Sequence, residues 1–399
     1  MNQNSPKREK KIAFSNSDYL DYAGFRRRTP KKRLTAGTVV RRILLVLLSL
    51  LLFIIISVYT LVFSVAHGPS ETVRDLLVQA ADQASATKWV PYLFLDKETV
   101  KGILSQSEVV SKEVISLLDY ADKGDDIVSD EQTDEWDGTQ DGLRFLTVKG
   151  STYTAYMMII KDPSRVFVGT SSDFKSGKEG INIFDATKKY GAVAAINAGE
   201  FSDPGGVGTG DNPIGLTYSQ GACVWDDGQK RTFIGIDKNH RLVVTEPMTK
   251  ARADELGIRD AVSFQRGNVL ITNDGDNITL HRADGNTGTA QRTAIGQRAD
   301  GAVIMLVTDG RSASSLGATR NDVIDVMVKH GAINAGMLDG GSSSLMYYEE
   351  YYNKYDYDYD SLDEYQKMGL VNKYKAFTTP RRMPTYFCVA REITESEEN

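Results

Sequence analysis

The chain has 399 residues, of which 41% are hydrophobic and 25% are charged, with a formal net charge of −6. This length allows one large globular domain or two average ones, and the composition is that of ordinary globular proteins. Up to residue 42 there are twelve Lys and Arg against three acidic residues, and the remainder carries about −15 by formal charge, which argues against nucleic-acid binding through that part.

Residues 1–42 form a basic arm in front of an apolar run, residues 43–66, which contains no charged side chain. A helix of this length would span roughly 36 Å, enough to cross a ~30 Å hydrocarbon core. We expect a transmembrane helix with the N-terminus in the cytoplasm, because Lys and Arg gather before it. A cleaved signal peptide is the alternative, since Ser64-Val65-Ala66 resembles a cleavage site, but the run and the arm are longer than signal peptides have.

Residues 67–141 are expected to form a helical stalk followed by an acidic linker. Ser70 can cap a first helix, and a second helical pattern follows it. The composition turns acidic and polar between residues 119 and 141, which is typical of a flexible linker, so we place the domain boundary there. The apolar positions of the second helical pattern are Val100, Ile103, Leu104, Val114, Leu117 and Leu118.

Residues 142–392 change to short apolar runs rich in β-branched and aromatic residues, separated by Gly, Asp and Asn. They predict an α/β or α+β domain with a mixed β-sheet and flanking helices, followed by a tail, residues 393–399. One helix is predicted to start at the cap Thr319 and to end at Gly331. The predicted strands include Leu143–Val148, Tyr153–Ile160, Arg165–Val168, Val193–Asn197, Leu242–Thr245, Val303–Thr308 and Pro384–Val389.

Three other features carry little chemistry. Residues 349–365 are crowded with Tyr, Asp and Glu without a core-facing period, so we expect a solvated insertion. Cys223 and Cys388 are too few for a disulfide framework, and whether they pair stays open.

The histidines lack partners at zinc-ligand spacing. No cofactor is predicted; a divalent cation such as Ca²⁺ is compatible with the many carboxylates, although residues 274–277 read as a hairpin turn rather than a calcium loop.

Polar groups follow three predicted strands, at the position where loops present functional groups from a rigid scaffold. Each turn alone has a structural explanation, because Gly and Asn tolerate the positive φ angles of tight turns. Together they combine carboxylates with Arg side chains and Gly/Ser donors, which indicates an anion site suited to a sugar phosphate. The residues are Asn197 and Glu200, then Arg292 with Asp309 and Arg311, then Asp339, Gly340, Gly341, Ser342 and Ser343.

In this order the motifs resemble the phosphodiester glycosidase family, of the uncovering-enzyme type. They are Ala-Ile-Asn-Ala-Gly (195–199), Gly-Leu (215–216), Arg-Thr-Ala-Ile-Gly-Gln (292–297), Thr-Asp-Gly-Arg (308–311) and Leu-Asp-Gly-Gly-Ser-Ser (338–343). The resemblance covers about residues 143–392 and implies hydrolysis of a sugar C1–O–phosphate bond. The expected outward orientation of this domain suggests that the substrate is a cell-surface glycan or glycoconjugate. All the candidate site residues lie on motif positions except Glu200, where relatives usually carry Gly or an aromatic.

By this resemblance Asp339 and Asp309 are predicted to be catalytic, and the other motif residues are predicted to bind substrate and phosphate. Glu200, which lies outside the motifs, is a third catalytic candidate, ranked below Asp339. Phosphate leaves as an anion whose second pKa is ~6, so no His is needed to protonate it. Asp339 would support an oxocarbenium-like centre or activate water. Two alternatives remain: a phosphotransferase or phosphodiesterase of cell-wall or exopolysaccharide biosynthesis that cleaves P–O, and a non-catalytic glycan-binding module. The expected partners are a sugar-phosphate polymer or glycoconjugate and the membrane, through residues 43–66, but not nucleic acid.

Overall fold

The computed structural model describes residues 36–82, 87–107, 110–124, 141–172, 174, 179–203, 210–265, 267–284, 288–310, 315–354, 357–374 and 379–392. Most of the predicted basic arm, most of the acidic linker and the predicted tail lie outside these residues. The chain divides into two compact units, Met1–Val62 and Phe63–Asn399.

Helix α1, Ala36–His67, contains the predicted transmembrane run. Within the described residues it is the one helix long and apolar enough to cross a membrane. The hydroxyl groups of Ser49 and Thr60 each donate to the carbonyl oxygen four residues earlier, at 2.8 Å. Hydrocarbon offers these polar groups no partner, so satisfying them within the helix suits a membrane span.

Two further helices follow in the second unit, as predicted: α2, Glu71–Asp82, and α3, Lys97–Ser107, with the short 3₁₀ helix η1, Pro91–Leu93, between them. The Ser70 hydroxyl oxygen accepts from the N–H of Val73 at 3.4 Å, which places it as a helix cap. The apolar faces of α2 and α3 pack against each other in a small core of Val78, Val100 and Ile103, with Leu95 and Leu104 beside it.

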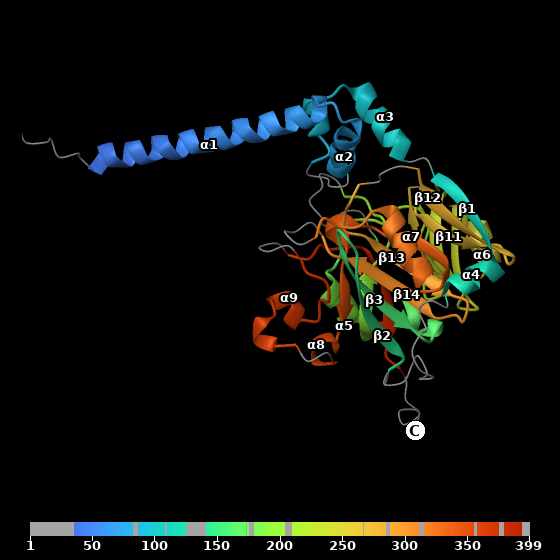
Figure 1. Ribbon diagram of the computed structural model, residues 1–399. Coiled ribbons are helices and arrows are strands. Elements are labelled where there is room, and N and C mark those ends of the chain that lie inside the picture. Colours follow the sequence, from blue (N-terminus) through green and yellow to red (C-terminus); the bar gives the residue numbers. More distant parts are fainter. Residues whose placement is uncertain are drawn as a thin grey trace, which may run out of the picture. The chain divides into compact units, whose positions relative to one another are not determined.

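The helical prediction was wrong for the next segment, which forms the strand β1, Val110–Ser116, before the short helix α4, Leu117–Gly124. β1 pairs along its whole length with β12, Asn277–Ala283, at the edge of the largest sheet (Figure 1). The apolar spacing through Val114 matched a helix, but strand pairing with a distant segment overrides local pattern. Part of the predicted stalk therefore belongs to the globular domain, and the predicted boundary at residue 142 lies too late.

Three sheets form this domain, with strand orders β1-β12-β11-β15-β13-β14-β3-β2, β7-β6-β10-β8-β9 and β16-β5-β17-β4. The predicted fold class is confirmed, but the pairings among described strands are antiparallel rather than mixed. The remaining strands are β2 Leu143–Lys149, β3 Thr154–Ile160, β4 Val166–Thr170, β5 Ala192–Asn197, β6 Thr217–Ser219, β7 Ala222–Trp225, β8 Arg231–Asp237, β9 Leu242–Met248, β10 Ile258–Phe264, β11 Val269–Asn273, β13 Thr293–Arg298, β14 Val303–Thr308, β15 Ala332–Met337, β16 Met346–Tyr348 and β17 Thr385–Ala390.

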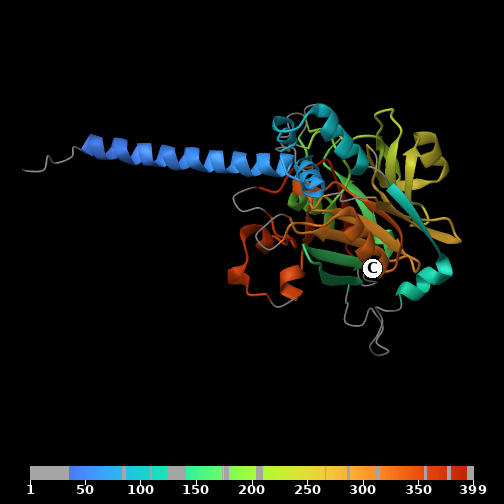
Figure 2. The ribbon, with the colours of Figure 1, turned by 45° about the horizontal axis from the view of Figure 1, so that its top comes forward.

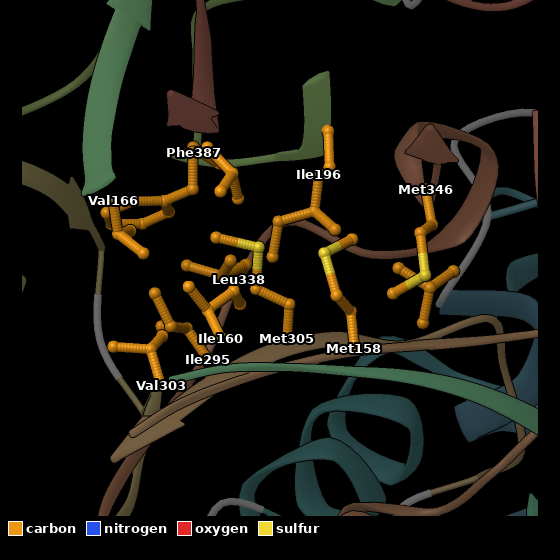
Figure 3. Packing of buried hydrophobic residues seen from close by; sticks show 14 of the residues in the cluster. Met158, Ile160, Val166, Ile196, Ile295, Val303, Met305, Leu338, Met346 and Phe387 are labelled. Carbon is orange, nitrogen blue, oxygen red and sulfur yellow. The ribbon is translucent and has the colours of Figure 1, made fainter. Parts of the chain in front are cut away.

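The main core lies between the eight-stranded sheet and the two smaller sheets. Met305 and Ile295 of the large sheet face Ile196 and Phe387 of the four-stranded sheet across this core (Figure 3). The opposite face of the large sheet packs on α7, Arg320–Lys329, through Ile324. Both faces of the large sheet are thus covered, which explains why every residue of β14 is buried, as its continuous apolar sequence predicted.

Helices close the outer faces of the sheets. α5, Ile183–Tyr190, packs on the four-stranded sheet, and α6, Lys250–Glu255, packs on the five-stranded one. Thr319 and Asp322 form the predicted capping box of α7, and Gly331 follows the helix at a φ of +78°. This helix is confirmed from cap to end, because its limits depend on local hydrogen bonds.

The Tyr-rich insertion forms one group of short helices, α8 Tyr351–Lys354, η6 Tyr359–Ser361 and α9 Glu364–Lys367 (Figures 1 and 2). It is not simply solvated as predicted, because Tyr351 is only 5% exposed and packs in the main core.

Residues 274–277 form the predicted turn between β11 and β12, with the Asp274 carboxylate accepting from two backbone N–H groups. Cys223 and Cys388 are free thiols. Among the described residues of the domain, η3, Pro163–Arg165, and η5, Gly341–Ser343, are further 3₁₀ turns.

Candidate active site

The second and third motifs meet at one end of the eight-stranded sheet. β13 runs antiparallel between β14 and β15, so its first residues lie beside the last residues of both neighbours. The carbonyl oxygen of Thr293 accepts from the N–H of Leu338 at 2.8 Å, and that of Arg292 accepts from the N–H of Thr308 at 2.8 Å. The turns that carry Asp309 and Asp339 are therefore neighbours, as the sequence predicted.

Asn197 brings the first motif, from the end of β5 in the four-stranded sheet, to the same place. Its side chain is fully buried, and its Nδ2 donates to the carbonyl oxygen of Asp339 at 2.6 Å. Its Oδ1 accepts from the Thr293 hydroxyl at 2.8 Å and from the N–H of Leu345 at 3.1 Å. Because the amide is occupied on both sides, we assign it the role of holding the two sheets together at the site.

Asp339 is the best-positioned carboxylate of this site. Leu338 anchors the segment in the main core (Figure 3), and the N–H of Asp339 donates to the carbonyl oxygen of Ala198 at 3.0 Å. Burial raises the pKa of the Asp339 carboxyl to about 6, opposed by hydrogen bonding from Ser343 and by the charge of Arg381, and reinforced by the charge of Glu200. The carboxylate can therefore gain or lose its proton near neutral pH.

Arg381 is the cation beside Asp339, and the sequence analysis missed it. Its Nη1 donates to the Ser343 hydroxyl oxygen at 3.2 Å, its Nη2 pairs with Asp203, and its Cζ lies 5.6 Å from the centroid of the Phe201 ring. No motif marks this residue. It stands four positions before β17, which pairs with β5, so that strand pairing was the signal needed to find it.

Glu200 joins this cluster, although it lies outside the family pattern. Its Oε2 accepts from the N–H of Gln265 at 2.9 Å, while its backbone N–H and carbonyl bond to Ser263 and Ile214. This fixes the carboxylate where its charge acts on Asp339. The structure thus brings Glu200 and Asp339 together as a carboxylate pair.

Asp309 lies on the flank of the site, beside the Tyr-rich insertion. Its Oδ2 accepts from the Tyr156 hydroxyl at 3.2 Å and its Oδ1 from the N–H of Lys373 at 3.2 Å. Burial raises the pKa of this carboxyl, and those two hydrogen bonds oppose the shift. The next residue along, Tyr374, donates through its hydroxyl to the carbonyl oxygen of Ser342 at 3.1 Å, so residues 373–374 connect Asp309 to the Ser turn.

The predicted phosphate ligands are placed differently from expectation. The Nε and Nη2 of Arg292 donate to the carbonyl oxygens of Ala318 and Gly288, each at 3.1 Å, and the residue is buried. These two nitrogen donors are already occupied by backbone carbonyl oxygens, so they do not support a contact between Arg292 and phosphate. That contact stays a prediction. Arg311 lies outside the described residues.

The turn at residues 340–344 was expected to form an anion nest of backbone N–H groups. Three of these groups are occupied within the protein: Gly341 donates to Gln291 at 2.9 Å, Ser343 to Gly340 at 3.2 Å and Ser344 to Gly341 at 3.2 Å. Glycine is needed at both positions for steric reasons. Gly341 has a φ of +63°, and a Cβ on Gly340 would lie 2.9 Å from the Gln291 carbonyl oxygen. The main role of the turn is therefore to position the Asp339 carboxylate and the hydroxyl groups of Ser342 and Ser343, rather than to offer backbone N–H groups to an anion.

Metal binding finds no support in the part of the chain that the structure describes, where no group of three or more His, Cys, Asp or Glu side chains is arranged to hold an ion. The prediction of a divalent cation is left without a site among those residues. The polar groups that the described residues gather around Asp339 are carboxylates, hydroxyl groups and the guanidinium group of Arg381.

The fold and the site thus define a domain of antiparallel sheets with a half-buried carboxylate pair, Glu200 and Asp339, at its strand ends. The family model described as phosphodiester glycosidase matches residues 190–390, which is half of the 399 residues. The chain belongs to the phosphodiester glycosidase family.

The proteins that are similar to the chain include one from Bacillus subtilis and one from zebrafish. An uncharacterized SPbeta prophage-derived protein, YomE, of Bacillus subtilis (strain 168) is 27% identical over 196 residues, 46% of this chain and 27% of that protein. The chain therefore spans about a quarter of the length of this curated relative. The zebrafish N-acetylglucosamine-1-phosphodiester alpha-N-acetylglucosaminidase catalytic domain, auto-inhibited by its pro-peptide, aligns over 71% of this chain and 89% of its own with 16% identity and a TM-score of 0.45.

Proposed function

We propose that the protein is a glycosidase that hydrolyses a sugar-1-phosphodiester at the C1–O bond, acting on a glycan or glycoconjugate outside the cytoplasmic membrane. The observation that carries this proposal is the Asp339 carboxylate, which the ends of β5, β13 and β15 hold beside Glu200 and Arg381 with a pKa of about 6. Family membership supports the reaction class.

In the proposed reaction, the C1–O bond breaks and its electron pair leaves with the phosphate, while the oxygen of water forms a new bond to C1. The products are a free sugar and a phosphomonoester, and the second proton of water passes to a carboxylate or to solvent. The ionised Asp339 carboxylate stabilises the positive charge that develops at C1 or takes the proton of the attacking water. Glu200 is the second carboxylate. If Asp339 stabilises the charge at C1, Glu200 takes the proton of the attacking water, and if Asp339 takes the proton, Glu200 stabilises the charge.

Arg381 provides the positive charge near the reacting centre. Its partners Ser343 and Asp203 hold the guanidinium group in one orientation, and one face of it lies against the Phe201 ring. A guanidinium group so placed can attract the phosphodiester and favour the ionised form of Asp339. In this proposal Arg381, rather than Arg292, is the described cation that meets the substrate.

Helix α1 is proposed to act as an uncleaved anchor, with the basic residues before it in the cytoplasm and the second unit outside. Its length, its lack of charge beyond Arg42 and the basic arm support this topology. Substrates would then belong to the cell surface, such as phosphate-linked polysaccharide.

The bond that breaks can be identified by isotope labelling. The full-length protein in detergent is incubated with a panel of sugar-1-phosphodiesters in H₂¹⁸O, and the products are analysed by mass spectrometry. We expect ¹⁸O in the released sugar and none in the phosphomonoester. Label in the phosphate would mean P–O cleavage, as in a phosphodiesterase, and binding without turnover across the panel would favour a glycan-binding module.

The pH dependence tests the coupling between Arg381 and Asp339. The charge of Arg381 lowers the pKa of Asp339, so Arg381→Met should raise that pKa above its value of about 6. Activity that needs the ionised carboxylate is lost as pH falls through the pKa, so the acid limb of kcat/KM should move to higher pH in the variant. Arg382→Met is the matched control, because Arg382 pairs with the exposed Glu179. An acid limb at the same pH in both variants would contradict the coupling.

A further inference from the structure

A short segment after α2 exposes three large apolar side chains. Trp89 is 59% exposed, Tyr92 45% and Leu93 60%, although Pro91 between them is buried. We call residues 89–93 the aromatic connector. Scattered exposed apolar side chains are common on protein surfaces, but an exposed Trp, Tyr and Leu within five residues concentrate apolar surface in one short segment.

The neighbouring helices share a small core that does not include the aromatic connector. Val78 of α2 and Val100 and Ile103 of α3 bury each other in the small core that the two helices share. Leu95, directly after the connector, packs against that core. The connector is therefore held by a folded helix pair, and Trp89, Tyr92 and Leu93 are the side chains that this core leaves outside.

We propose that the aromatic connector binds the lipid–water interface of the membrane that α1 crosses. Trp and Tyr favour this interface, where the ring meets the acyl chains and the N–H or O–H group stays hydrated, and Leu adds an apolar contact. Lys88 is the single charged residue between Thr87 and Leu95, and its positive charge suits anionic headgroups. The inference rests on the proposal that α1 is an uncleaved anchor.

The tether supports lipid as the partner. Residues 68–88 separate the end of α1 from Trp89, and twelve of them form α2. At ~1.5 Å per helical residue and ~3.5 Å per extended residue, the connector stays within about 50 Å of the membrane along the chain. A tethered surface meets its partner at high effective concentration, so a few side chains are enough for stable contact.

The test uses tryptophan fluorescence, because the chain has three Trp residues and none in α1. The full-length double variant Trp136→Phe/Trp225→Phe, which keeps Trp89, is reconstituted in nanodiscs of phosphatidylcholine and phosphatidylglycerol, with or without bromine on the acyl chains. The matched control, Trp89→Phe/Trp136→Phe, keeps Trp225 in β7. We expect brominated lipid to remove most of the Trp89 emission and to leave the Trp225 emission unchanged.

Two results would overturn the proposal. Trp89 emission that brominated lipid leaves intact and aqueous iodide quenches would show a connector open to water. Emission shielded from iodide but insensitive to brominated lipid would show a protein partner or a second copy instead. Neither readout depends on catalysis, and intact mass measured on the same sample shows whether α1 is retained, so failure here is distinguishable from failure of the proposed glycosidase.

Discussion

Asp339→Asn should lower the kcat for a sugar-1-phosphodiester by ~10³-fold or more while the protein stays folded. The amide keeps the size of the carboxylate and can still accept from the Ser343 hydroxyl, but it carries no charge to stabilise C1 and takes no proton from water. Steady-state kinetics on the full-length protein measures the loss. Asp276→Asn, in the exposed β11–β12 turn, is the control and should keep full activity.

The same substitution should stabilise the protein above neutral pH. The pKa of Asp339 is raised in the folded state, so its favourable contribution is present below the unfolded value near 4 and is lost as pH rises through about 6. A rise of the pKa from about 4 to about 6 corresponds to at most about 2–3 kcal/mol of destabilisation by the ionised form, which Asn removes. We expect Tm to rise by several degrees at pH 8 and by about half as much at pH 5, which lies midway between the two pKa values.

Calorimetry or circular dichroism at the two pH values checks this expectation. Full turnover by the Asn variant would remove Asp339 from catalysis, and an unchanged Tm at pH 8 would mean that its carboxylate is not held in a buried environment. Loss of activity together with gain of stability is the combination expected when a fold keeps a costly charge for its chemistry.

Asn197→Ala should lower the free energy of unfolding by about 3–5 kcal/mol and remove activity with it. The substitution leaves the Thr293 hydroxyl, the N–H of Leu345 and the carbonyl of Asp339 without their buried partner. Urea denaturation measures the effect. Asn353→Ala, which removes an exposed amide in α8, should change stability by less than ~0.5 kcal/mol.

If Asn197→Ala changed the free energy of unfolding as little as Asn353→Ala, the two sheets would be joined at the site by other contacts. Thr293→Val provides a second check, because it removes one of the three hydrogen bonds and should account for only part of the loss. The two substitutions together should cost less than the sum of each alone, since they remove one shared hydrogen bond.

The sequence predicted those parts of the molecule whose pattern is local. Continuous apolar residues identified β14, and a capping box with a terminal glycine identified α7. The convergence of Asn197, Asp309 and Asp339 also followed, because polar turns after buried strands gather at sheet ends. These inferences need only short-range chemistry and the rule that loops carry function.

The rest depended on pairings between distant segments. β1 reads as helix until its partner β12 is known, and Arg381 joins the site only because β17 pairs with β5. The N–H of Gly341 is occupied by the carbonyl oxygen of Gln291, and the guanidinium group of Arg292 by those of Ala318 and Gly288, which no motif spacing reveals. The acidic composition of the insertion likewise gave no indication that Tyr351 is buried.

The place of β1 has a practical consequence for anyone who expresses the protein without helix α1. A fragment that begins at residue 142, the limit that composition suggests, would strip β12 of its neighbour and leave a row of backbone N–H and C=O groups open along it. Such rows recruit strands from other molecules, so we expect that fragment to aggregate. Soluble protein should come from fragments that start upstream of Val110, ideally at Ser70, where the α2–α3 pair is also complete.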